Sequence, residues 1–391
     1  MITSRSLRYA VSCLLSLLLL TSVTPRLTRA DAAPCLVMLK DGDLWMWCDG
    51  SEDIQQLTQY GHHRRPVMSP NGAYIAFNSI APETVTALTA LGYSATDISL
   101  DDWPSNMWVM SLIDRQPVQI AAQPAEIGFA GALPNNAVSR SNPTWSPDGQ
   151  TIAWTEIVFD QNPALDSLTY RLVTYNLVTN TTQVIVPDLP KPYQKEETLR
   201  AIRVLWGAGG LALVISHEPP MRELYIFDPN GQQIVMASLG RENFYDFLWM
   251  NDGDRAYVGI MYFAKPWELV DPATGQAQPM NGTPEMYSTQ GDNYATFITI
   301  KMNGAQIAGL EWQAAEKSIS KVAPIDFHGE TNFAHRITVS PVGVAFVSDA
   351  VYVWRESGVK RIKNTENIAR GWEDTEAGGL AWGTTAWRVR R

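Results

Sequence analysis

Short apolar stretches that alternate with polar positions recur along nearly the whole chain, and turn residues separate them. Residues 65–77 read R-P-V-M-S-P-N-G-A-Y-I-A-F, and residues 142–154 read N-P-T-W-S-P-D-G-Q-T-I-A-W. In both stretches a short strand ends at Ser-Pro, where proline presets φ, Asn or Asp bonds the local backbone and glycine supplies a positive φ. An alternating strand then leaves the turn, so each stretch predicts a β-hairpin.

Weaker copies of this hairpin follow along the chain. They lie at 205–210, 248–253, 339–343 and 381–384, with a degenerate copy at 287–300. A second pair of strands follows each hairpin, as in 43–47 with 54–58, 106–110 with 117–120 and 223–227 with 233–235. Seven hairpins and seven such pairs predict four-stranded units of a β-propeller. The chain begins with an outer pair and ends with the inner hairpin 379–391, so we expect its two ends to share one blade.

The repeated pattern L-[WY]-[VI]-x-[DN] … L-T … [WS]-S-P-[DN]-G-x-x-I-A-[FW] resembles the repeat of TolB-like β-propellers. It is also similar to the repeat in the propeller domains of dipeptidyl-peptidase-type enzymes. The resemblance covers residues 36–391 and implies an all-β propeller of four-stranded blades. We expect seven blades, and six is the alternative because closed members of the family often have six. The resemblance says little about function, since unrelated proteins use this fold.

The first 32 residues have the pattern of a secretory leader. Arg5 and Arg8 precede an apolar run at 11–23, and Ala30-Asp31-Ala32 gives a cleavage pattern. The run is too short to span a membrane comfortably. We therefore expect a signal peptide at 1–32, a single propeller domain at 33–391, and a periplasmic, cell-envelope or secreted location. An uncleaved membrane anchor is the alternative.

Cysteine usage agrees with export. Of the three cysteines, Cys35 and Cys48 remain after cleavage, and they flank Asp41-Gly42, a strong signal for a two-residue hairpin turn. Counting outward from the turn sets Cys35 opposite Cys48 in a non-hydrogen-bonded pair, where the Cα atoms are close enough for a disulfide. We expect this disulfide in an oxidising compartment, and two free thiols are the alternative.

The charge balance excludes one class of partner. The chain has a net charge of −10, and the leader carries four arginines and one aspartate, so cleavage takes the net charge to about −13. Nonspecific binding to nucleic acid or anionic lipid needs clustered Lys and Arg. We therefore expect a soluble, monomeric protein with no nucleic-acid partner and no membrane span after cleavage.

Three long connections, 81–105, 122–141 and 188–201, fall on one face of the predicted propeller, whereas the hairpin turns are short. Long ordered loops on a rigid scaffold are where binding sites usually lie. Asp101, Asp102 and Trp103 belong to this face and are candidate ligand-binding residues. The alternatives are that the aromatic residues pack the loops and that the two aspartates form a solvated pair.

A basic group stands near the same face. His62 and His63 precede an inner strand, and Arg65, Arg203 and Arg336 each lie three residues before the reference position of their repeat copy. Those reference positions are Met68, Trp206 and Val339. We expect the arginines at equal heights near the central channel, where their planar forks suit carboxylate or phosphate groups. Salt bridges to neighbouring blades are the alternative. Histidine would add positive charge below about pH 6.5.

The sequence contains no G-x-S-x-G, H-E-x-x-H, P-loop, C-x-x-C or EF-hand pattern, so we expect no cofactor and no metal. Two function classes remain. The favoured one is a non-catalytic binding or scaffold propeller, which engages a protein or peptide partner, possibly anionic, through the long-loop face. The alternative is a small extracytoplasmic propeller enzyme, lactonase-like or glycan-cleaving, which needs carboxylates or a metal converging on the channel.

Overall fold

Strands that follow one another in the chain pair antiparallel and build one sheet after another. The computed structural model describes residues 35–94, 103–130, 133–160, 168–192, 202–216, 221–240, 244–251, 255–262, 266–280, 297–300, 306–313, 318–326, 335–340, 343–347, 350–355, 358–366, 368 and 380–382. The chain divides into two compact units, residues 1–33 and 34–391, and all described residues belong to the second. The expected leader at 1–32 lies outside the described residues.

The described strands form seven sheets of three to five strands and one two-stranded ribbon. Sheet 1 is β30 (Leu380–Trp382), β1 (Cys35–Lys40), β2 (Asp43–Cys48) and β3 (Gln55–Gln56). Sheet 2 is β4 (His63–Met68), β5 (Tyr74–Ile80), β6 (Ser105–Ser111) and β7 (Pro117–Ala121). Sheet 3 is β10 (Ala137–Arg140) and β11 (Thr144–Trp145), both on β12 (Thr151–Phe159), then β13 (Thr169–Asn176) and β14 (Thr181–Val186).

The later sheets repeat the same up-and-down order. Sheet 4 is β15 (Val204–Gly207), β16 (Gly210–Ser216), β17 (Arg222–Phe227) and β18 (Gln233–Gly240). Sheet 5 is β19 (Phe244–Asn251), β20 (Ala256–Tyr262), β21 (Glu268–Val270) and β22 (Ala277–Pro279). Sheet 6 is β23 (Phe297–Ile300), β24 (Gln306–Gln313) and β25 (Ser318–Asp326). Sheet 7 is β26 (His335–Ser340), β27 (Gly343–Val347), β28 (Val351–Arg355) and β29 (Gly358–Arg361).

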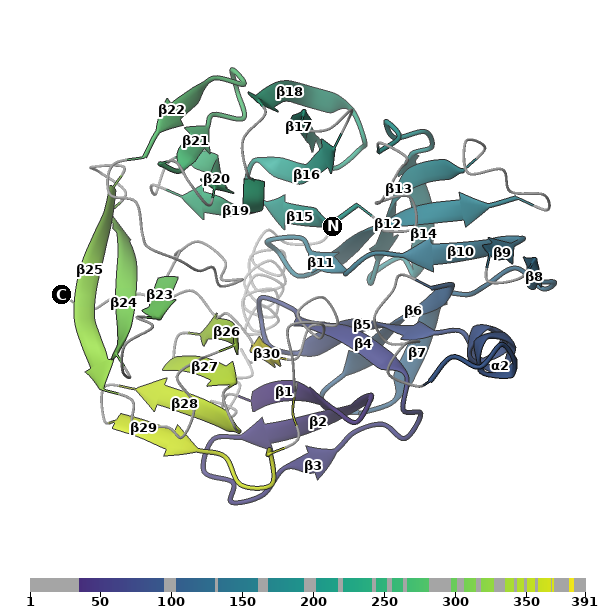
Figure 1. Cartoon of the computed structure of the whole chain (residues 1–391), viewed down its shortest axis with the longest axis horizontal. Helices are drawn as coiled ribbons and strands as arrows, with labels where there is room; N and C mark the ends of the chain where they lie inside the picture. The colour runs from purple at the N-terminus through teal and green to yellow at the C-terminus, as the bar shows by residue number, and fades with distance from the viewer. Residues whose placement is uncertain are drawn as a thin grey trace, which may run out of the picture. The chain divides into compact units, whose positions relative to one another are not determined.

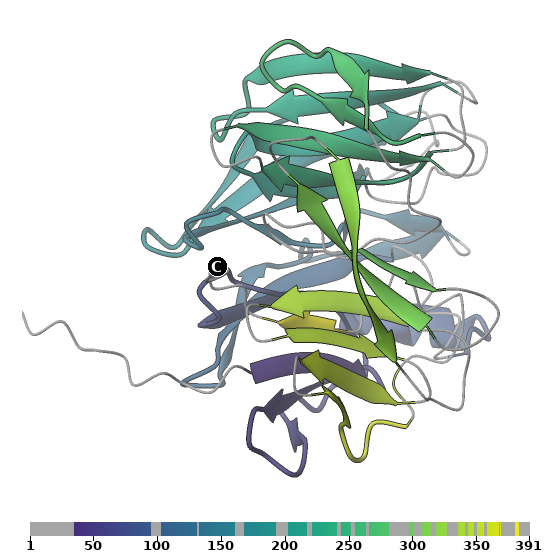
Figure 2. The same ribbon diagram turned by 90° about the vertical axis from the view of Figure 1, so that its left-hand side faces the viewer.

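The first strand of each sheet lies nearest a common centre, and the sheets radiate from it as propeller blades do (Figure 1). The inner strands β26, β30, β4, β11, β15 and β19 lie beside one another in that order. Turns and connections gather at two ends of the strands (Figure 2). At one end the connection from β5 to β6 contains an unforeseen helix, α2 (Pro82–Ala90), and the connection from β7 to β10 contains the ribbon of β8 (Gly128–Ala130) and β9 (Leu133–Asn135).

Sheets 1 to 4 each bury apolar side chains on both faces. Along β1, Leu36 and Met38 pack against sheet 7, whereas Val37 packs against sheet 2, and all three are fully buried. This alternation follows from the two-residue period of a strand. Further apolar clusters lie between sheets 2 and 3, 3 and 4, and 4 and 5. None of the helices in the described part of the chain is long and apolar enough to cross a membrane.

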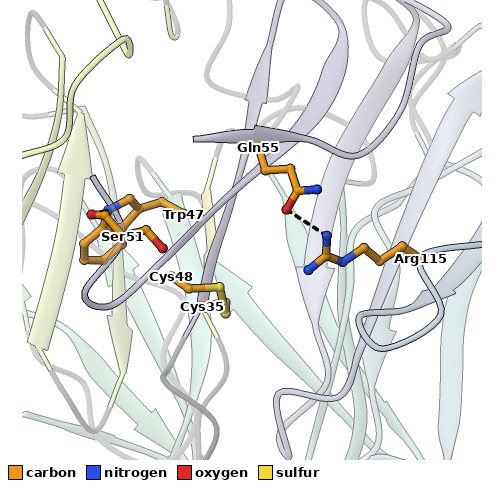
Figure 3. The surroundings of a disulfide bond; sticks show 6 residues. All are labelled: Cys35, Trp47, Cys48, Ser51, Gln55 and Arg115. Atoms are coloured by element: carbon orange, nitrogen blue, oxygen red, sulfur yellow. Dashed lines mark hydrogen bonds between the residues drawn. A yellow bond between two sulfur atoms is a disulfide. The ribbon is translucent and has the colours of Figure 1, made fainter. Parts of the chain in front are cut away.

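The predicted Asp-Gly hairpin and its disulfide are present. Asp41 and Gly42 have φ values of 53° and 73°, and the strands they join pair Cys35 with Cys48. The two cysteines form a disulfide with a Cα–Cα distance of 4.0 Å (Figure 3). Gly42 is required for its space as well as its φ, because a Cβ there would lie 1.9 Å from the carbonyl oxygen of Gly61.

The two ends of the propeller unit share sheet 1, as expected, but the predicted division of strands is wrong. Leu380, Ala381 and Trp382 of β30 pair directly with β1, so the N-terminal segment supplies three strands and the C-terminal segment supplies the innermost one. The remainder of the expected hairpin 379–391 lies outside the described residues.

Removal of β30 tests how sheet 1 is held. A chain that ends at residue 379 leaves the inner edge of β1 unpaired, and its apolar faces lose their cover. We expect it to aggregate or to lose cooperative urea unfolding, followed by tryptophan fluorescence and gel filtration. A chain that ends at Trp382 keeps β30 and is the matched control. Equal behaviour of the two truncations would show that β30 does not hold sheet 1.

The disulfide predicts the redox state and part of the stability. Thiol titration of the exported protein, unfolded without reductant, should find no free thiol on Cys35 or Cys48. The double variant Cys35→Ser, Cys48→Ser should lose roughly 3 kcal/mol of unfolding free energy, the chain-entropy value for a loop of this size. Titration of two free thiols per chain would contradict the assignment.

Candidate functional site

Tryptophans of the repeat set the relative heights of neighbouring inner strands. The indole Nε1 of Trp145 on β11 donates a 2.9 Å hydrogen bond to the carbonyl oxygen of Val67 on β4. In the same way Trp249 on β19 donates a 3.0 Å bond to the carbonyl of Leu205 on β15. Both donors occupy the reference position of their repeat copy, and both acceptors lie one residue before it. Equivalent repeat positions on adjacent inner strands therefore lie at similar heights.

Arg65 lies three residues before the reference position, where the hydrogen-bonded pairing of β4 with β5 is interrupted. The pairing of β4 with β5 shifts register between Arg64 and Val67, so Arg65 and Pro66 form a bulge. Arg65 has a φ of 54° and its residue is 5% exposed. A left-handed conformation at a non-glycine residue before proline costs about 1–3 kcal/mol. Bulges of this kind redirect side chains and are frequent beside binding sites.

The other aligned arginines lie at comparable breaks. The ladder of β26 shifts between His335 and Ile337, which places Arg336 in a bulge, and its side chain lies outside the described set. Arg203 directly precedes β15, is half-buried, and its guanidinium lies 5.6 Å from the centroid of the Phe247 ring on β19. The three arginines thus lie on the inner strands β26 and β4 and directly before the inner strand β15, with β30 and β11 between these strands.

The segment that leads into β4 is held by Asp43 of sheet 1. Its Oδ1 accepts hydrogen bonds from the backbone N–H groups of Tyr60, at 2.7 Å, and Gly61, at 3.1 Å, and from Thr58 Oγ1 at 3.0 Å. His63 Nε2 lies 3.9 Å from the same oxygen. The Asp-Gly turn of sheet 1 therefore supports the approach to the channel-side residues of sheet 2.

Histidine titration differs from the expectation at this site. Burial lowers the pKa of His63 to about 4, and the nearby Asp43 carboxylate raises it only in part. Burial also lowers the pKa of His62, again against the effect of Asp43. The expected gain of histidine charge just below pH 6.5 is therefore wrong, because a ring enclosed by Tyr60 and Phe77 cannot solvate a proton charge. Positive charge at this place comes from the arginines.

Trp103 lies elsewhere, on the outer part of sheet 2. It is buried with Ile80 and Leu88, and the Tyr93 ring meets it edge-on with centroids 5.8 Å apart. Phe129 of the ribbon packs on the same cluster. Trp103 therefore fixes the β5–β6 connection onto the sheet and is not grouped with Arg65. Asp101 and Asp102 lie outside the described residues.

A buried charge network that sequence reasoning missed runs across sheet 3. Glu156 on β12 accepts hydrogen bonds from Arg140 Nε at 2.8 Å, Arg171 Nε at 2.5 Å and Trp154 Nε1 at 3.0 Å. Burial raises the pKa of Glu156, but the two guanidinium groups and these hydrogen bonds outweigh it, so the pKa lies below its usual value. The sequence signal was a glutamate within the apolar strand T-I-A-W-T-E-I-V-F.

The same network attaches the long connections to the sheets. Arg140 donates to the carbonyl oxygens of Ser105, the first residue of β6, and, at 2.9 Å, of Ala122, which directly follows β7. Gln123 bridges the two sheets by donating to the carbonyls of Ser105 at 2.7 Å and Val138 at 2.8 Å. Within the described ranges, no group of three or more His, Cys, Asp or Glu residues is placed to hold a metal ion.

No protein-family model matches the sequence, and no curated protein is significantly similar to it. Solved structures with a similar fold include the β-propeller domain of the Trilobed protease from Pyrococcus furiosus, at 12% identity, 85% coverage of this chain, 97% of that chain and a TM-score of 0.50. TolB from Acinetobacter baumannii matches at 11% identity, 90% and 67% coverage and a TM-score of 0.41. An oligogalacturonate lyase in complex with manganese matches at 13% identity, 81% and 83% coverage and a TM-score of 0.46.

Identities this low show the fold and not the activity. The expected likeness to a peptidase-type propeller is confirmed at the level of the fold by the Trilobed protease domain. The chain is a predominantly β protein with the fold of these propellers.

The low pKa of His63 predicts how stability changes with pH. The unfolded chain binds a proton at His63 near pH 6.5 and the folded chain near pH 4, so stability is complete above about 6.5 and falls as the pH drops toward 4. The full loss is about 3 kcal/mol. Urea unfolding at pH 7.5 and 4.5 should show a smaller pH difference for His63→Gln than for the wild type. His62→Gln is the control, and an unchanged difference in His63→Gln would contradict the assignment.

Proposed function

We propose that the protein is an exported, non-catalytic propeller of seven blades that binds a carboxylate-bearing protein or peptide at the entry of its inner strands. Seven sheets of three to five strands in the described part of the chain support the count of seven blades. The Cys35–Cys48 disulfide supports an oxidising, extracytoplasmic location. The binding residues are Arg65, Arg203 and Arg336, with the half-buried His62 at the approach to β4.

The observation that carries this proposal is the common height of the repeat positions. The tryptophan–carbonyl bonds between β11 and β4, and between β19 and β15, place residues of equal repeat position side by side. The positions three residues before the reference positions lie where the pairing of the inner strands is interrupted or begins. Three of these positions are arginines. Inner strands begin at the end of the sheets that also carries α2 and the β8–β9 ribbon. The position of these residues at one end of the strands supports a repeated set of cations there.

Electrostatics favour an anionic ligand at this place despite the acidic chain. Local charge rather than net charge determines what is drawn to a cleft. Arg65 lies nine-tenths buried, where the effective dielectric constant is below that of water and its field reaches further. Arginine also provides paired N–H donors that match a carboxylate. The net charge of the chain, −10, repels anions elsewhere on the surface and so adds selectivity.

The site stands on a rigid scaffold. Arg140, Glu156 and Arg171 form a cross-strand line on sheet 3, and the side chains of Arg140 and Glu156 are each 3% exposed. The hydrogen bonds that Arg140 donates to backbone carbonyls of sheet 2 hold the two neighbouring blades in fixed relative positions. Binding residues on such a support lose little conformational entropy when a ligand arrives. An enzyme remains the second candidate, and metal analysis of purified protein separates the two.

The test uses the double variant Arg203→Gln, Arg336→Gln. We expect the wild type to bind an N-acetylated tetra-aspartate peptide at low salt in calorimetry, and the variant to bind it about tenfold or more weakly, because charge-assisted hydrogen bonds are lost. Urea unfolding of the variant should stay near the wild type. The control is Arg115→Gln, an exposed arginine that bonds Gln55 at the opposite end of the sheets (Figure 3).

Two outcomes would contradict the proposal. One is a wild type that does not bind the peptide. The other is a variant that loses stability but keeps its affinity, which would assign the arginines to structural salt bridges between blades.

A further inference from the structure

The inner edge of sheet 3 is interrupted between β10 and β11, and Asn142 lies in the interruption. Its backbone is held on both sides. Ser141 exchanges hydrogen bonds with Thr155, through its N–H at 3.0 Å and its Oγ at 2.9 Å, and its Oγ also donates to the Asn142 carbonyl at 3.1 Å. Pro143 follows, is buried, and has a fixed φ. Asn142 is therefore a rigidly placed residue.

The side-chain amide of Asn142 has no structural partner. It is half-buried and makes no hydrogen bond within the described ranges. Other asparagines of these blades have structural bonds. The Asn78 amide donates to the Arg140 carbonyl at 3.2 Å, and the Asn176 side chain accepts from the N–H of Val178 at 2.9 Å. Asn142 is thus available for a ligand.

Its neighbours are the arginine positions of the proposed site. Asn142 lies three residues before Trp145, the same repeat position as Arg65 on β4 and Arg203 on β15. The Trp145–Val67 bond joins β11 to β4, and the Trp206 N–H joins β15 to β11 by a 3.0 Å bond to Thr144 Oγ1. On consecutive inner strands the order is therefore arginine, asparagine, arginine.

An asparagine between two arginines discriminates between anion classes. Arginine only donates, whereas the amide has two N–H donors and an accepting carbonyl oxygen. At neutral pH a phosphate ester offers chiefly acceptors, so the Asn142 oxygen faces it without a partner. A peptide offers N–H groups beside its carbonyls and carboxylates, and so satisfies both sides of the amide.

We infer that Asn142 is a specificity-determining residue of the arginine site and that the ligand is an acidic peptide rather than a phosphate ester. This inference rests on the proposed function. The acidic side chains meet the arginines, and the peptide backbone pairs with the Asn142 amide.

The experiment measures binding of three probes by calorimetry to the wild type, Asn142→Ala and the arginine double variant. The probes are N-acetylated tetra-aspartate peptide, butanetetracarboxylate, which has carboxylates but no amide, and inorganic pyrophosphate. We expect Asn142→Ala to weaken peptide binding about tenfold and to leave the other two within about twofold. The arginine variant should weaken all three. Asn230→Ala, at an exposed turn, is the control, and urea unfolding checks that each variant folds.

The experiment distinguishes a failure of the role given to Asn142 from a failure of the ligand class and from a failure of the proposed function. If Asn142→Ala weakens all probes equally, or none, while the arginine variant weakens them, the role given to Asn142 is wrong and the anion site stands. Tighter wild-type binding of pyrophosphate than of the peptide overturns the ligand class. If the arginine variant leaves all three affinities unchanged, the proposed function itself fails.

Discussion

The structure depends on burial of both faces of a sheet, as in sheets 1 to 4. Neither face of a strand such as β1 is exposed to solvent, because Leu36 and Met38 pack against sheet 7 and Val37 packs against sheet 2. Each such side chain contributes about 1.5–3 kcal/mol when it is fully covered. A single blade is therefore unstable alone, and sheet 1, which joins the two ends of the propeller unit, stabilises both of its neighbours. Across this junction Arg355 NH1 also bonds Asp49 at 2.9 Å, an interaction near the surface that adds little energy.

The same requirement governs the polar groups between blades. A charged side chain that is buried between two sheets must be paired. This explains why Glu156 accepts hydrogen bonds from Arg140, Arg171 and Trp154 together. Arg140 then satisfies carbonyls that the β6 and β7 ends leave without ladder partners. Polar residues at the inner ends of the strands are under a weaker constraint. There the strand pairing is interrupted, and Arg203 and Asn142 are half-buried, so polar side chains are accommodated at these positions without a loss of packing.

Burial also divides the basic residues into two kinds. His63 loses its charge because imidazole can release its proton, and the enclosed ring favours the neutral form. Arginine keeps its proton under the same conditions, since its pKa is far higher. The buried His63 therefore influences stability rather than ligand charge. The likeness to a protease β-propeller domain at 12% identity shows the fold alone, so this chemistry, and not the architecture, carries the functional argument.

The sequence by itself determined the local events. The x-P-x-x-S-P-[DN]-G repeat specified hairpins because proline and glycine act on their own backbone, and Asp41-Gly42 set the register that pairs Cys35 with Cys48. Tertiary structure decided which strand lies beside which and where water reaches. It placed β30 directly on β1, lowered the pKa of His63, assembled Glu156 with its two arginines, and left the side-chain amide of Asn142 without a partner among the described residues. These outcomes depend on residues far apart in the chain, and a local pattern carries no information about such neighbours.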